Sequence, residues 1–231
     1  MLTLRYSEER GQGRLDWLDS RFSFSFSDYY DPEHMGFSAL RVINEDVIQP
    51  GGGFATHGHR DMEIITYVLS GSIEHKDSEG NTKILPAGEF QLMSAGAGIF
   101  HSEYNPSVSE PLHLLQIWIQ PHTPGGLPGY QQKAFDKQSG LTTIATERGE
   151  NGTLKIKQDA VLHHLILEPG SVLTFETRQQ RNTYIHLISG NLKVDQTEIA
   201  PGDAAKVVQQ DTVALSNRGS ETVTALIFDL P

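Results

Sequence analysis

The sequence predicts an all-β protein built as a sandwich or a barrel. Short apolar runs rich in β-branched residues recur along the 231 residues, and Gly, Pro, Asp and Asn turns separate them. No segment shows a convincing helical period of apolar residues. Many short strands with frequent turn signals are typical of sandwiches and barrels.

The first strand is predicted over residues 21–28, where Phe alternates with Ser. Phe22, Phe24 and Phe26 would then share one face of the strand, and the serines would lie on the other. Residues 29–32 form a turn, and a second strand is expected over residues 37–43, ending near residues 44–46. We interpret the aromatic face as core packing, with substrate contact as the alternative.

Further strands in the first half are expected at residues 54–59, 64–69, 72–75, 83–85, 90–93 and 112–119. Turns connect them at residues 49–53 and 86–89, and residues 77–81 form a hairpin loop. Residues 94–98, Ser-Ala-Gly-Ala-Gly, allow a sharp bend, because glycine tolerates positive φ and close backbone approach.

The Pro- and Gly-rich residues 121–129 are the most linker-like segment, and we expect a domain boundary just beyond it. Residues 1–135 would form an N-terminal domain and residues 136–231 a C-terminal one. Strands of the second half are predicted at residues 162–167, 172–175, 183–188, 192–194 and 223–228.

The second half repeats the turns of the first. A Pro-Gly turn precedes residues 54–59 and another precedes residues 172–175, and in each half an apolar strand then ends in Gly before a further Pro-containing turn. Residues 175–178, Phe-Glu-Thr-Arg, stand where the first half has two histidines. The C-terminal domain is therefore expected to bind no metal.

Four potential metal ligands occur as two alternating pairs, His57 with His59 and His101 with Glu103. Residues i and i+2 of a β-strand share one face, so two such strands side by side would gather three imidazoles and one carboxylate. This donor set is typical of a first-row transition metal, whereas Ca²⁺ and Mg²⁺ prefer mostly oxygen ligands. One His-x-His pair alone is compatible with surface histidines that have no function, and the second pair favours a metal site.

Composition excludes several other classes of function. The absence of Cys removes disulfides, thiolate metal sites and thiol nucleophiles. The net charge of −11 disfavours direct nucleic-acid binding, because the summed field repels phosphates. Residues 1–10 carry no signal-peptide core and no apolar run reaches the length of a membrane span, so we expect a soluble, cytoplasmic protein.

Two groups of residues resemble the motifs of the cupin superfamily. Those that match the first motif are Gly51, His57, His59 and Glu63, and those that match the second are Gly98, His101 and Asn105. Gly71 lies one position later than the usual spacing, and Gly96 replaces the expected proline. Further segments make the first 120 or so residues similar to the pirin family of bicupins: Arg21-Phe22-Ser23-Phe24, Asp31-Pro32, Gly36-Phe37, Leu40-Arg41-Val42, His57-Gly58-His59-Arg60, Met93-Ser94-Ala95-Gly96 and His101-Ser102-Glu103.

The resemblance implies two jelly-roll-like cupin barrels and one divalent metal in the N-terminal barrel, usually Fe(II), with Mn, Ni, Co, Cu or Zn as alternatives. It implies His57, His59, His101 and Glu103 as ligands, and Glu63 as a motif residue outside the ligand set. It also implies quercetin 2,3-dioxygenase activity, in which O₂ opens the central ring of a flavonol and CO is released. Other family members are regulators that bind protein partners, so a non-catalytic regulatory or redox-sensing role is the alternative.

Glu103 is the candidate catalytic base, because a carboxylate at the metal could accept the proton of the flavonol 3-hydroxyl. Flat apolar walls suit a planar polyphenol, and the candidates are Phe37, Phe54, Tyr104 and Trp118, for each of which core packing is the alternative. His113 is interpreted as an interior or rim histidine and not as a fifth ligand. A different metal-dependent reaction, such as an isomerisation, also fits the same barrel.

Overall fold

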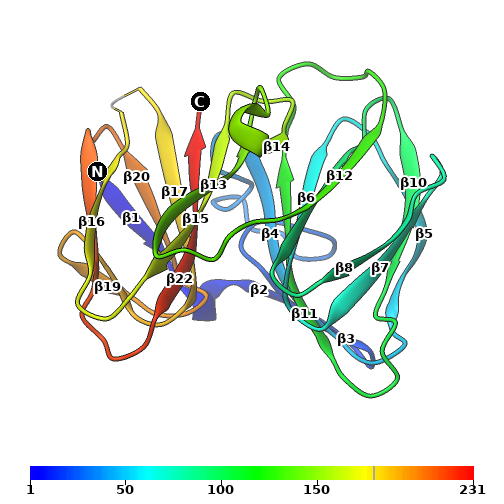
Figure 1. Ribbon diagram of the computed structural model, residues 1–231, viewed down its shortest axis with the longest axis horizontal. Coiled ribbons are helices and arrows are strands. Elements are labelled where there is room, and N and C mark those ends of the chain that lie inside the picture. Colours follow the sequence, from blue (N-terminus) through cyan, green and yellow to red (C-terminus); the bar gives the residue numbers. More distant parts are fainter. Residues whose placement is uncertain (179) are drawn as a thin grey trace. The chain divides into compact units, whose positions relative to one another are not determined.

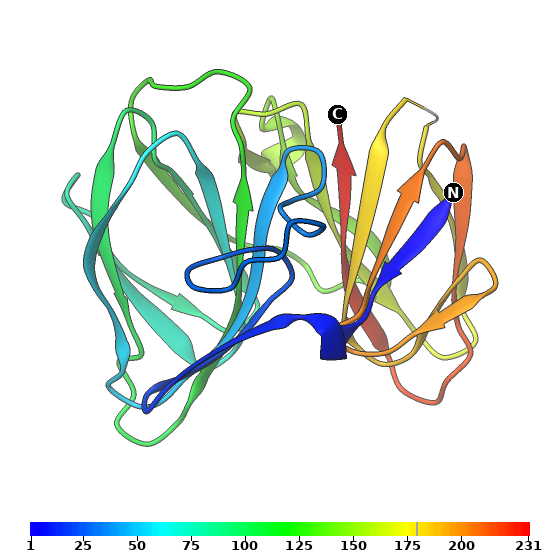
Figure 2. The same cartoon turned by 180° about the vertical axis from the view of Figure 1, so that it is seen from behind.

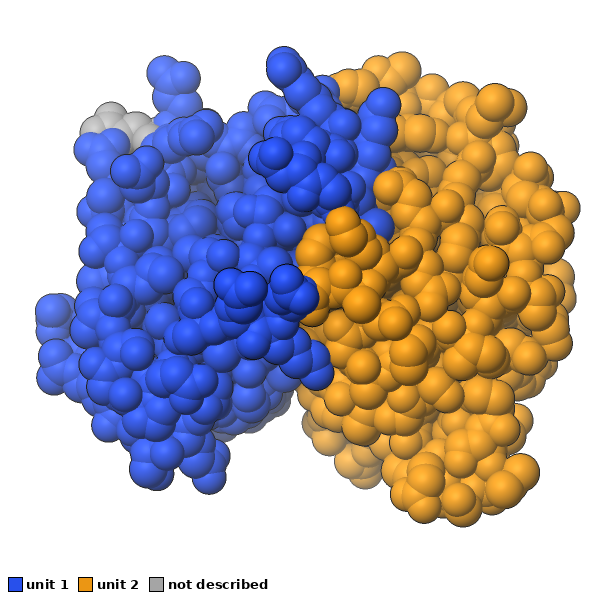
Figure 3. All heavy atoms as spheres, in the orientation of Figure 1, with its two compact units in different colours: residues 1–10, 136–155, 159–231 blue, residues 11–135, 156–158 orange. Residues whose placement is uncertain are grey.

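A computed structural model describes residues 1–178 and 180–231, which fold almost entirely into β-strands (Figures 1 and 2). The chain divides into two compact units, drawn in different colours in Figure 3. The N-terminal unit comprises residues 11–135 and 156–158, and the C-terminal unit comprises residues 1–10, 136–155 and 159–231. No helix in these described residues is long and apolar enough to cross a membrane.

The N-terminal unit contains two antiparallel sheets. The larger has seven strands in the order β12-β9-β6-β11-β4-β3-β2: Gly129–Ala134, Glu89–Ser94, Glu63–Ser70, Leu112–Ile119, Leu40–Ile48, Leu18–Phe22 and Gly11–Leu15. The smaller has four strands in the order β5-β10-β7-β8: Gly53–His59, Ile99–Tyr104, Ser72–Asp77 and Thr82–Pro86. Apolar side chains from both sheets meet in a buried cluster that includes Val68 of β6, Ile73 of β7 and Leu85 of β8. The two sheets therefore enclose one core, as in a barrel.

The C-terminal unit repeats this arrangement. Its larger sheet has the order β1-β20-β17-β22-β15-β13-β14: Leu2–Arg5, Ala204–Val208, Asn182–Ser189, Val223–Leu230, Val161–Leu167, Gly140–Thr146 and Leu154–Lys155. Its smaller sheet has the order β16-β21-β18-β19: Val172–Glu176, Thr212–Asn217, Leu192–Val194 and Thr197–Ile199. Two short 3₁₀ helices, η1 (Ser7–Glu9) and η2 (Glu150–Gly152), belong to the same unit.

The repeat extends to the loop that follows the second strand of each small sheet. Asn105 after β10 and Asn217 at the end of β21 each donate their side-chain amide to two backbone carbonyls, at 2.8–3.0 Å. The backbone N–H of Gly51 donates to the Asn105 carbonyl, and that of Gly170 donates to the Asn217 carbonyl. These shared contacts show that Gly51 and Asn105 of the N-terminal unit are equivalent to Gly170 and Asn217 of the C-terminal unit.

The start of the chain belongs to the C-terminal unit. Leu2–Arg5 forms β1, which pairs with β20 in a register that sets Leu2 opposite Val207. In the N-terminal unit, β12 has the corresponding place beside β9. A division into residues 1–135 and 136–231 thus leaves the first ten residues with the N-terminal domain, although they complete the sheet of the C-terminal unit.

The strand predicted over residues 21–28 is wrong in extent, because β3 ends at Phe22. Ser23 and Ser25 are buried together with Phe24, so these two serines do not lie on an exposed face. The Ser25 hydroxyl donates to the carbonyl of Asp31 at 2.9 Å and accepts from its N–H at 2.8 Å. These local hydrogen bonds satisfy a buried serine outside any sheet, which the alternating pattern alone does not reveal.

The second predicted strand, over residues 37–43, is also displaced. The observed strand β4 begins at Leu40 and continues to Ile48, through the polar residues that were expected to end it. Asn44 and Asp46 are buried within β4, between β3 and β11. A central position in the sheet therefore outweighs the turn preference of Asn and Asp.

Candidate metal centre

The two predicted ligand pairs lie on neighbouring antiparallel strands. His57 and His59 occupy β5, His101 occupies β10, and the register sets His101 directly opposite His57. The Nε2 atoms of His57 and His101 are 3.0 Å apart. The ring centroids of the three histidines are 4.5–4.8 Å from one another. Strand alternation therefore brings three imidazoles to one point.

Glu103 lies close to His101 on the same strand, after an irregularity in the pairing. The register of β10 against β5 shifts between His101 and Glu103, so Glu103 lies opposite Phe54. Its side chain is buried, and Oε2 accepts a hydrogen bond from Gln116 Nε2 at 2.8 Å. Its Oε1 is buried without a hydrogen-bond partner among the described residues. A buried carboxylate oxygen without a donor is costly, and a cation at this point would satisfy it.

His59 and His101 are held in the neutral form that binds metals. Burial, together with the neighbouring His57, lowers the pKa of His59 to about 4. Burial and three neighbouring histidines, His57, His59 and His75, lower the pKa of His101 to about 2. The His57 Nδ1–H donates to the carbonyl of Ala55 at 2.8 Å, which leaves the Nε2 lone pair free. Three imidazoles and one carboxylate oxygen are donors that fit a divalent transition metal.

Two residues near the centre were not identified from the sequence. His75 of β7 is buried beside His101, with 3.5 Å between their Nδ1 atoms, and its Nε2 lies 2.9 Å from Asp77 Oδ2. The ligand atoms of His75, His101 and Glu103 lie within 4.8 Å of one another, as do those of His57, His59 and His101. The i, i+2 spacing of His75 and Asp77 is the one sequence signal that could have drawn attention to them.

Aromatic side chains border the imidazoles. The ring of Trp118 on β11 lies 4.9 Å from that of His59, edge to face. Phe54 lies 6.4 Å from His57 and packs edge to face against Trp17 at 5.1 Å. Tyr104 is exposed on β10, and Phe37 forms an isolated bridge with Leu40. Of the four predicted wall residues, the structure thus brings Phe54 and Trp118 to the imidazoles.

The remaining candidate residues serve other contacts. His113 Nε2 lies 2.9 Å from Glu45 Oε1, so its imidazole interacts with a carboxylate. Glu63 Oε2 accepts hydrogen bonds from Ser94 Oγ at 2.8 Å and from the backbone N–H of Lys157 at 3.2 Å. Both residues are therefore structural in this unit.

The C-terminal unit has other residues at the equivalent positions. Glu176 and Arg178 stand six and eight residues after Gly170, as His57 and His59 stand after Gly51. Counting back from Asn217, as from Asn105, sets the buried apolar Val213 and Leu215 in the places of His101 and Glu103.

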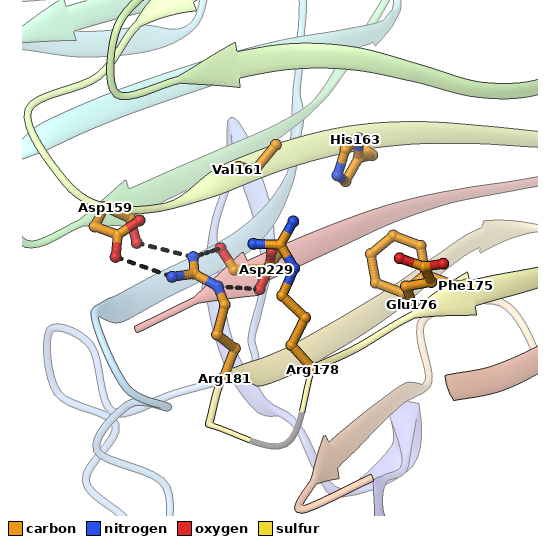
Figure 4. A pocket seen from close by; sticks show the side chains of 8 residues that line it. All are labelled: Asp159, Val161, His163, Phe175, Glu176, Arg178, Arg181 and Asp229. Atoms are coloured by element: carbon orange, nitrogen blue, oxygen red, sulfur yellow. Dashed lines mark hydrogen bonds and ion pairs between the residues drawn. The ribbon is translucent and has the colours of Figure 1, made fainter. Parts of the chain in front are cut away.

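A cavity of about 250 Å³ remains at this place in the C-terminal unit (Figure 4). Its lining residues are Asp159, Val161, His163, Phe175, Glu176, Arg178, Arg181 and Asp229. Arg181 donates to Asp159 Oδ2 at 2.9 Å and to Asp229 Oδ1 at 2.5 Å. Over the described residues, the clusters of potential metal ligands all lie in the N-terminal unit.

Comparison with known proteins identifies the family. Residues 3–119 match the family model described as Pirin, and residues 143–230 match the one described as Quercetinase C-terminal cupin domain. The chain belongs to the pirin family. This confirms the expected fold of two cupin barrels, to which the two units of this pirin correspond.

Relatives of this pirin extend over its whole length. It is 46% identical to quercetin 2,3-dioxygenase of Escherichia coli K12, over 100% of this chain and 99% of that relative. It is 43% identical to a putative quercetin 2,3-dioxygenase of Pasteurella multocida, over 100% of both chains. The crystal structure of the bacterial pirin YhhW of Escherichia coli in complex with nickel(II) superposes with a TM-score of 0.96 at 44% identity, over 100% of this chain and 99% of that chain. This pirin is thus similar throughout to oxidoreductases and to a metal-bound protein.

Gly53→Ala is expected to weaken metal binding on the order of tenfold, the scale seen when ligand geometry is disturbed. A Cβ at Gly53 would lie 2.3 Å from the Glu103 carbonyl oxygen and 2.6 Å from Tyr104 Cα, so the backbone of β10 would have to move. Metal affinity is measured by competition with a chromophoric chelator. Gly58→Ala is the matched control, because its Cβ would meet the exposed Phe100 ring at 3.1 Å. Equal affinities for the two variants would contradict the expectation.

Asp46→Asn is expected to remove a loss of stability that the metal-free protein undergoes as the pH rises from about 4 to about 7. Burial raises the pKa of Asp46 to about 7, although Ser20 Oγ donates to its carboxylate at 2.5 Å. The folded state therefore binds a proton that the unfolded state, with a pKa of about 3.9, has released. Stability therefore falls as the pH rises from about 4 to about 7, by at most roughly 4 kcal/mol at about 1.4 kcal/mol per pKa unit, and levels off above pH 7.

Urea unfolding of the metal-free protein at pH 5 and pH 8 tests this expectation. Tryptophan fluorescence reports on the right part of the molecule, because both tryptophans, Trp17 and Trp118, lie in the N-terminal unit with Asp46. Asp19→Asn, at a half-exposed position of β3, should leave the pH dependence unchanged. Identical pH dependence in Asp46→Asn and the unmodified protein would contradict the assignment.

Proposed function

We propose that this pirin is a metal-dependent dioxygenase that cleaves flavonols such as quercetin across the 2,3-bond with O₂ and releases CO. The observations that carry this proposal are the cluster of the His57, His59 and His101 imidazoles and, close to His101, the buried Glu103 carboxylate, whose Oε1 has no hydrogen-bond partner among the described residues. The full-length similarity to enzymes named quercetin 2,3-dioxygenase supports the choice of reaction and of a planar polyphenol as substrate.

The proposed ligands are His57, His59, His101 and Glu103, and the proposed metal is Fe(II). Mn, Ni, Co, Cu and Zn are compatible with the same nitrogen and oxygen donors, and a similar pirin binds nickel(II). When bound, the metal supplies Lewis-acid and redox chemistry next to the substrate. We assign this centre to an N-terminal domain of residues 1–135 and propose that residues 136–231 bind no metal.

Glu103 is the proposed base for the 3-hydroxyl proton of the flavonol. Burial raises the pKa of its carboxyl group, which strengthens its affinity for a proton. Gln116 holds Oε2 by a hydrogen bond at 2.8 Å, so Oε1 is the oxygen available for the proton. Phe54 and Trp118 flank the histidines and would orient the flat rings of the substrate.

The alternative is a non-catalytic metal-containing regulator or redox sensor that acts through a protein partner. Phe100 is 61% exposed on β10, in the strand that also carries His101 and Glu103. An exposed aromatic next to a metal ligand could transmit the state of the centre to a partner. For either role we propose a cytoplasmic protein without direct contacts to nucleic acid or membrane.

Turnover assays distinguish these two roles. Protein purified without O₂ and loaded separately with Fe, Mn, Ni, Co or Cu is mixed with quercetin and air-saturated buffer. Loss of the flavonol absorbance together with CO in the headspace is expected for at least one metal. Full metal occupancy without turnover for all five metals would contradict the dioxygenase and favour the regulator.

A further inference from the structure

A chain of buried polar groups leads away from the metal side of His101. The Nε2 of His101 faces His57, and its Nδ1 lies on the opposite side of the ring, 3.5 Å from the Nδ1 of His75. The Nε2 of His75 lies 2.9 Å from Asp77 Oδ2. The side chains of His75 and Asp77 are both 0% exposed, so no water competes for these contacts.

The hairpin after β7 fixes the Asp77 carboxylate. The backbone N–H groups of Glu79 and Asn81 each donate to Oδ1 at 3.0 Å. The Asn81 side-chain amide donates to Oδ1 at 3.1 Å and to Oδ2 at 2.9 Å. Gly80, with a φ of 90°, allows the tight turn that directs these donors inward. A carboxylate held by so many N–H donors is a fixed acceptor.

The Asp77 carboxylate determines which atom donates in each hydrogen bond between Asp77, His75 and His101. Because Asp77 only accepts, His75 Nε2 carries the hydrogen, and the Nδ1 of a neutral His75 is left as an acceptor. The Nδ1 of His101 then donates to it. A neutral His101 with its hydrogen on Nδ1 has its lone pair on Nε2, the atom that faces His57.

We propose that Asp77 and His75 form a relay of two consecutive hydrogen bonds that fixes the tautomer and orientation of His101. His101 is then the most firmly oriented of the metal ligands. The inference rests on the proposed ligand set and is independent of the substrate. Two of the ligands differ in their support: His57 donates to a single backbone carbonyl, at 2.8 Å, whereas His101 has a buried imidazole and a fixed carboxylate behind it. His75 and Asp77 are therefore positioning residues.

Asp77→Asn is the sharpest variant, because it keeps the shape of the side chain and replaces an acceptor oxygen by a donor N–H₂. That donor would move the hydrogen of His75 to Nδ1, where it opposes the Nδ1–H of His101. We expect metal affinity, measured by chelator competition, to fall 10- to 100-fold, as is usual when a partner of a ligating histidine is lost. His75→Gln, which retains an acceptor oxygen, is expected to bind more tightly than His75→Ala. Lys76→Ala, at an exposed side chain of the same strand, is the control.

Histidine-selective ¹⁵N NMR of the unmodified protein, loaded with Zn²⁺, tests the relay without any substitution. The expected spectrum shows His101 protonated at Nδ1 and His75 at Nε2. The opposite tautomers would overturn the inference, as would affinities of Asp77→Asn and His75→Ala within twofold of the unmodified protein. Complete loss of metal in folded His75→Ala, matching His101→Ala, would also overturn it, because His75 would then be a ligand. Metal affinity and histidine tautomers do not depend on flavonol turnover. The relay and the dioxygenase activity can therefore be disproved independently of each other.

Discussion

Replacing His57 and His59 together by alanine is expected to abolish both metal binding and flavonol oxidation. The change removes two of the three imidazoles whose rings lie 4.5–4.8 Å apart and leaves His101 and Glu103, which are too few donors for a stable transition-metal site. Elemental analysis of the purified variant should find no stoichiometric metal. The rate of quercetin loss should fall to that of the uncatalysed reaction.

His113→Ala is the matched control for this double substitution. It also removes an imidazole from the N-terminal unit, but one that is committed to Glu45 at 2.9 Å. Metal content should stay at one ion per chain, and turnover should stay within a few-fold of the unmodified enzyme. Turnover that survives in His57→Ala/His59→Ala would show that the ligand assignment is wrong.

The second large effect is expected for Glu103→Gln. The amide is nearly isosteric with the carboxylate and keeps an oxygen for the metal, so metal content should fall less than in the double histidine variant. It is a far weaker proton acceptor, and loss of a general base typically lowers the rate by about 10²- to 10⁴-fold. We therefore expect a large fall in kcat in samples adjusted to equal metal occupancy, with a smaller change in KM.

Gln116→Ala separates the two roles of the Glu103 carboxylate. It removes the hydrogen bond to Oε2 at 2.8 Å and leaves Oε1 in place, so it should affect kcat much less than Glu103→Gln does. If Glu103→Gln retains the full kcat at equal metal occupancy, Glu103 is a ligand and not the base.

The cluster of His57, His59 and His101 could be predicted from the sequence because its geometry is local. Each ligand pair has i, i+2 spacing, and strand alternation places such a pair on one face whatever the rest of the fold does. The glycine-rich residues 94–98 were expected to bend the chain before the second pair, and β10 begins directly after them, at Ile99. The register shift between His101 and Glu103 leaves no mark in the sequence, since it depends on the neighbouring strand.

Other features depend on tertiary structure and could not be predicted in this way. His75 acquires its place from the pairing of β7 with β10, between residues distant in sequence. Strand β12 (Gly-Tyr-Gln-Gln-Lys-Ala) is polar and follows the linker-like segment, so only its pairing with β9 makes it a strand. The same holds for β1, which pairs with β20 across most of the chain length. Hydrophobic pattern therefore identifies buried central strands better than edge strands.

Anomalous diffraction from crystals of the metal-loaded protein, recorded at the absorption edge of the metal, tests the central claim most directly. We predict one strong peak per chain, at about 2.0–2.2 Å from the ligand nitrogens of His57, His59 and His101 and from Glu103 Oε1, and no peak in the cavity lined by Arg178 and Arg181. A peak bound to His75, a peak in the C-terminal unit or no peak at full loading would contradict the account.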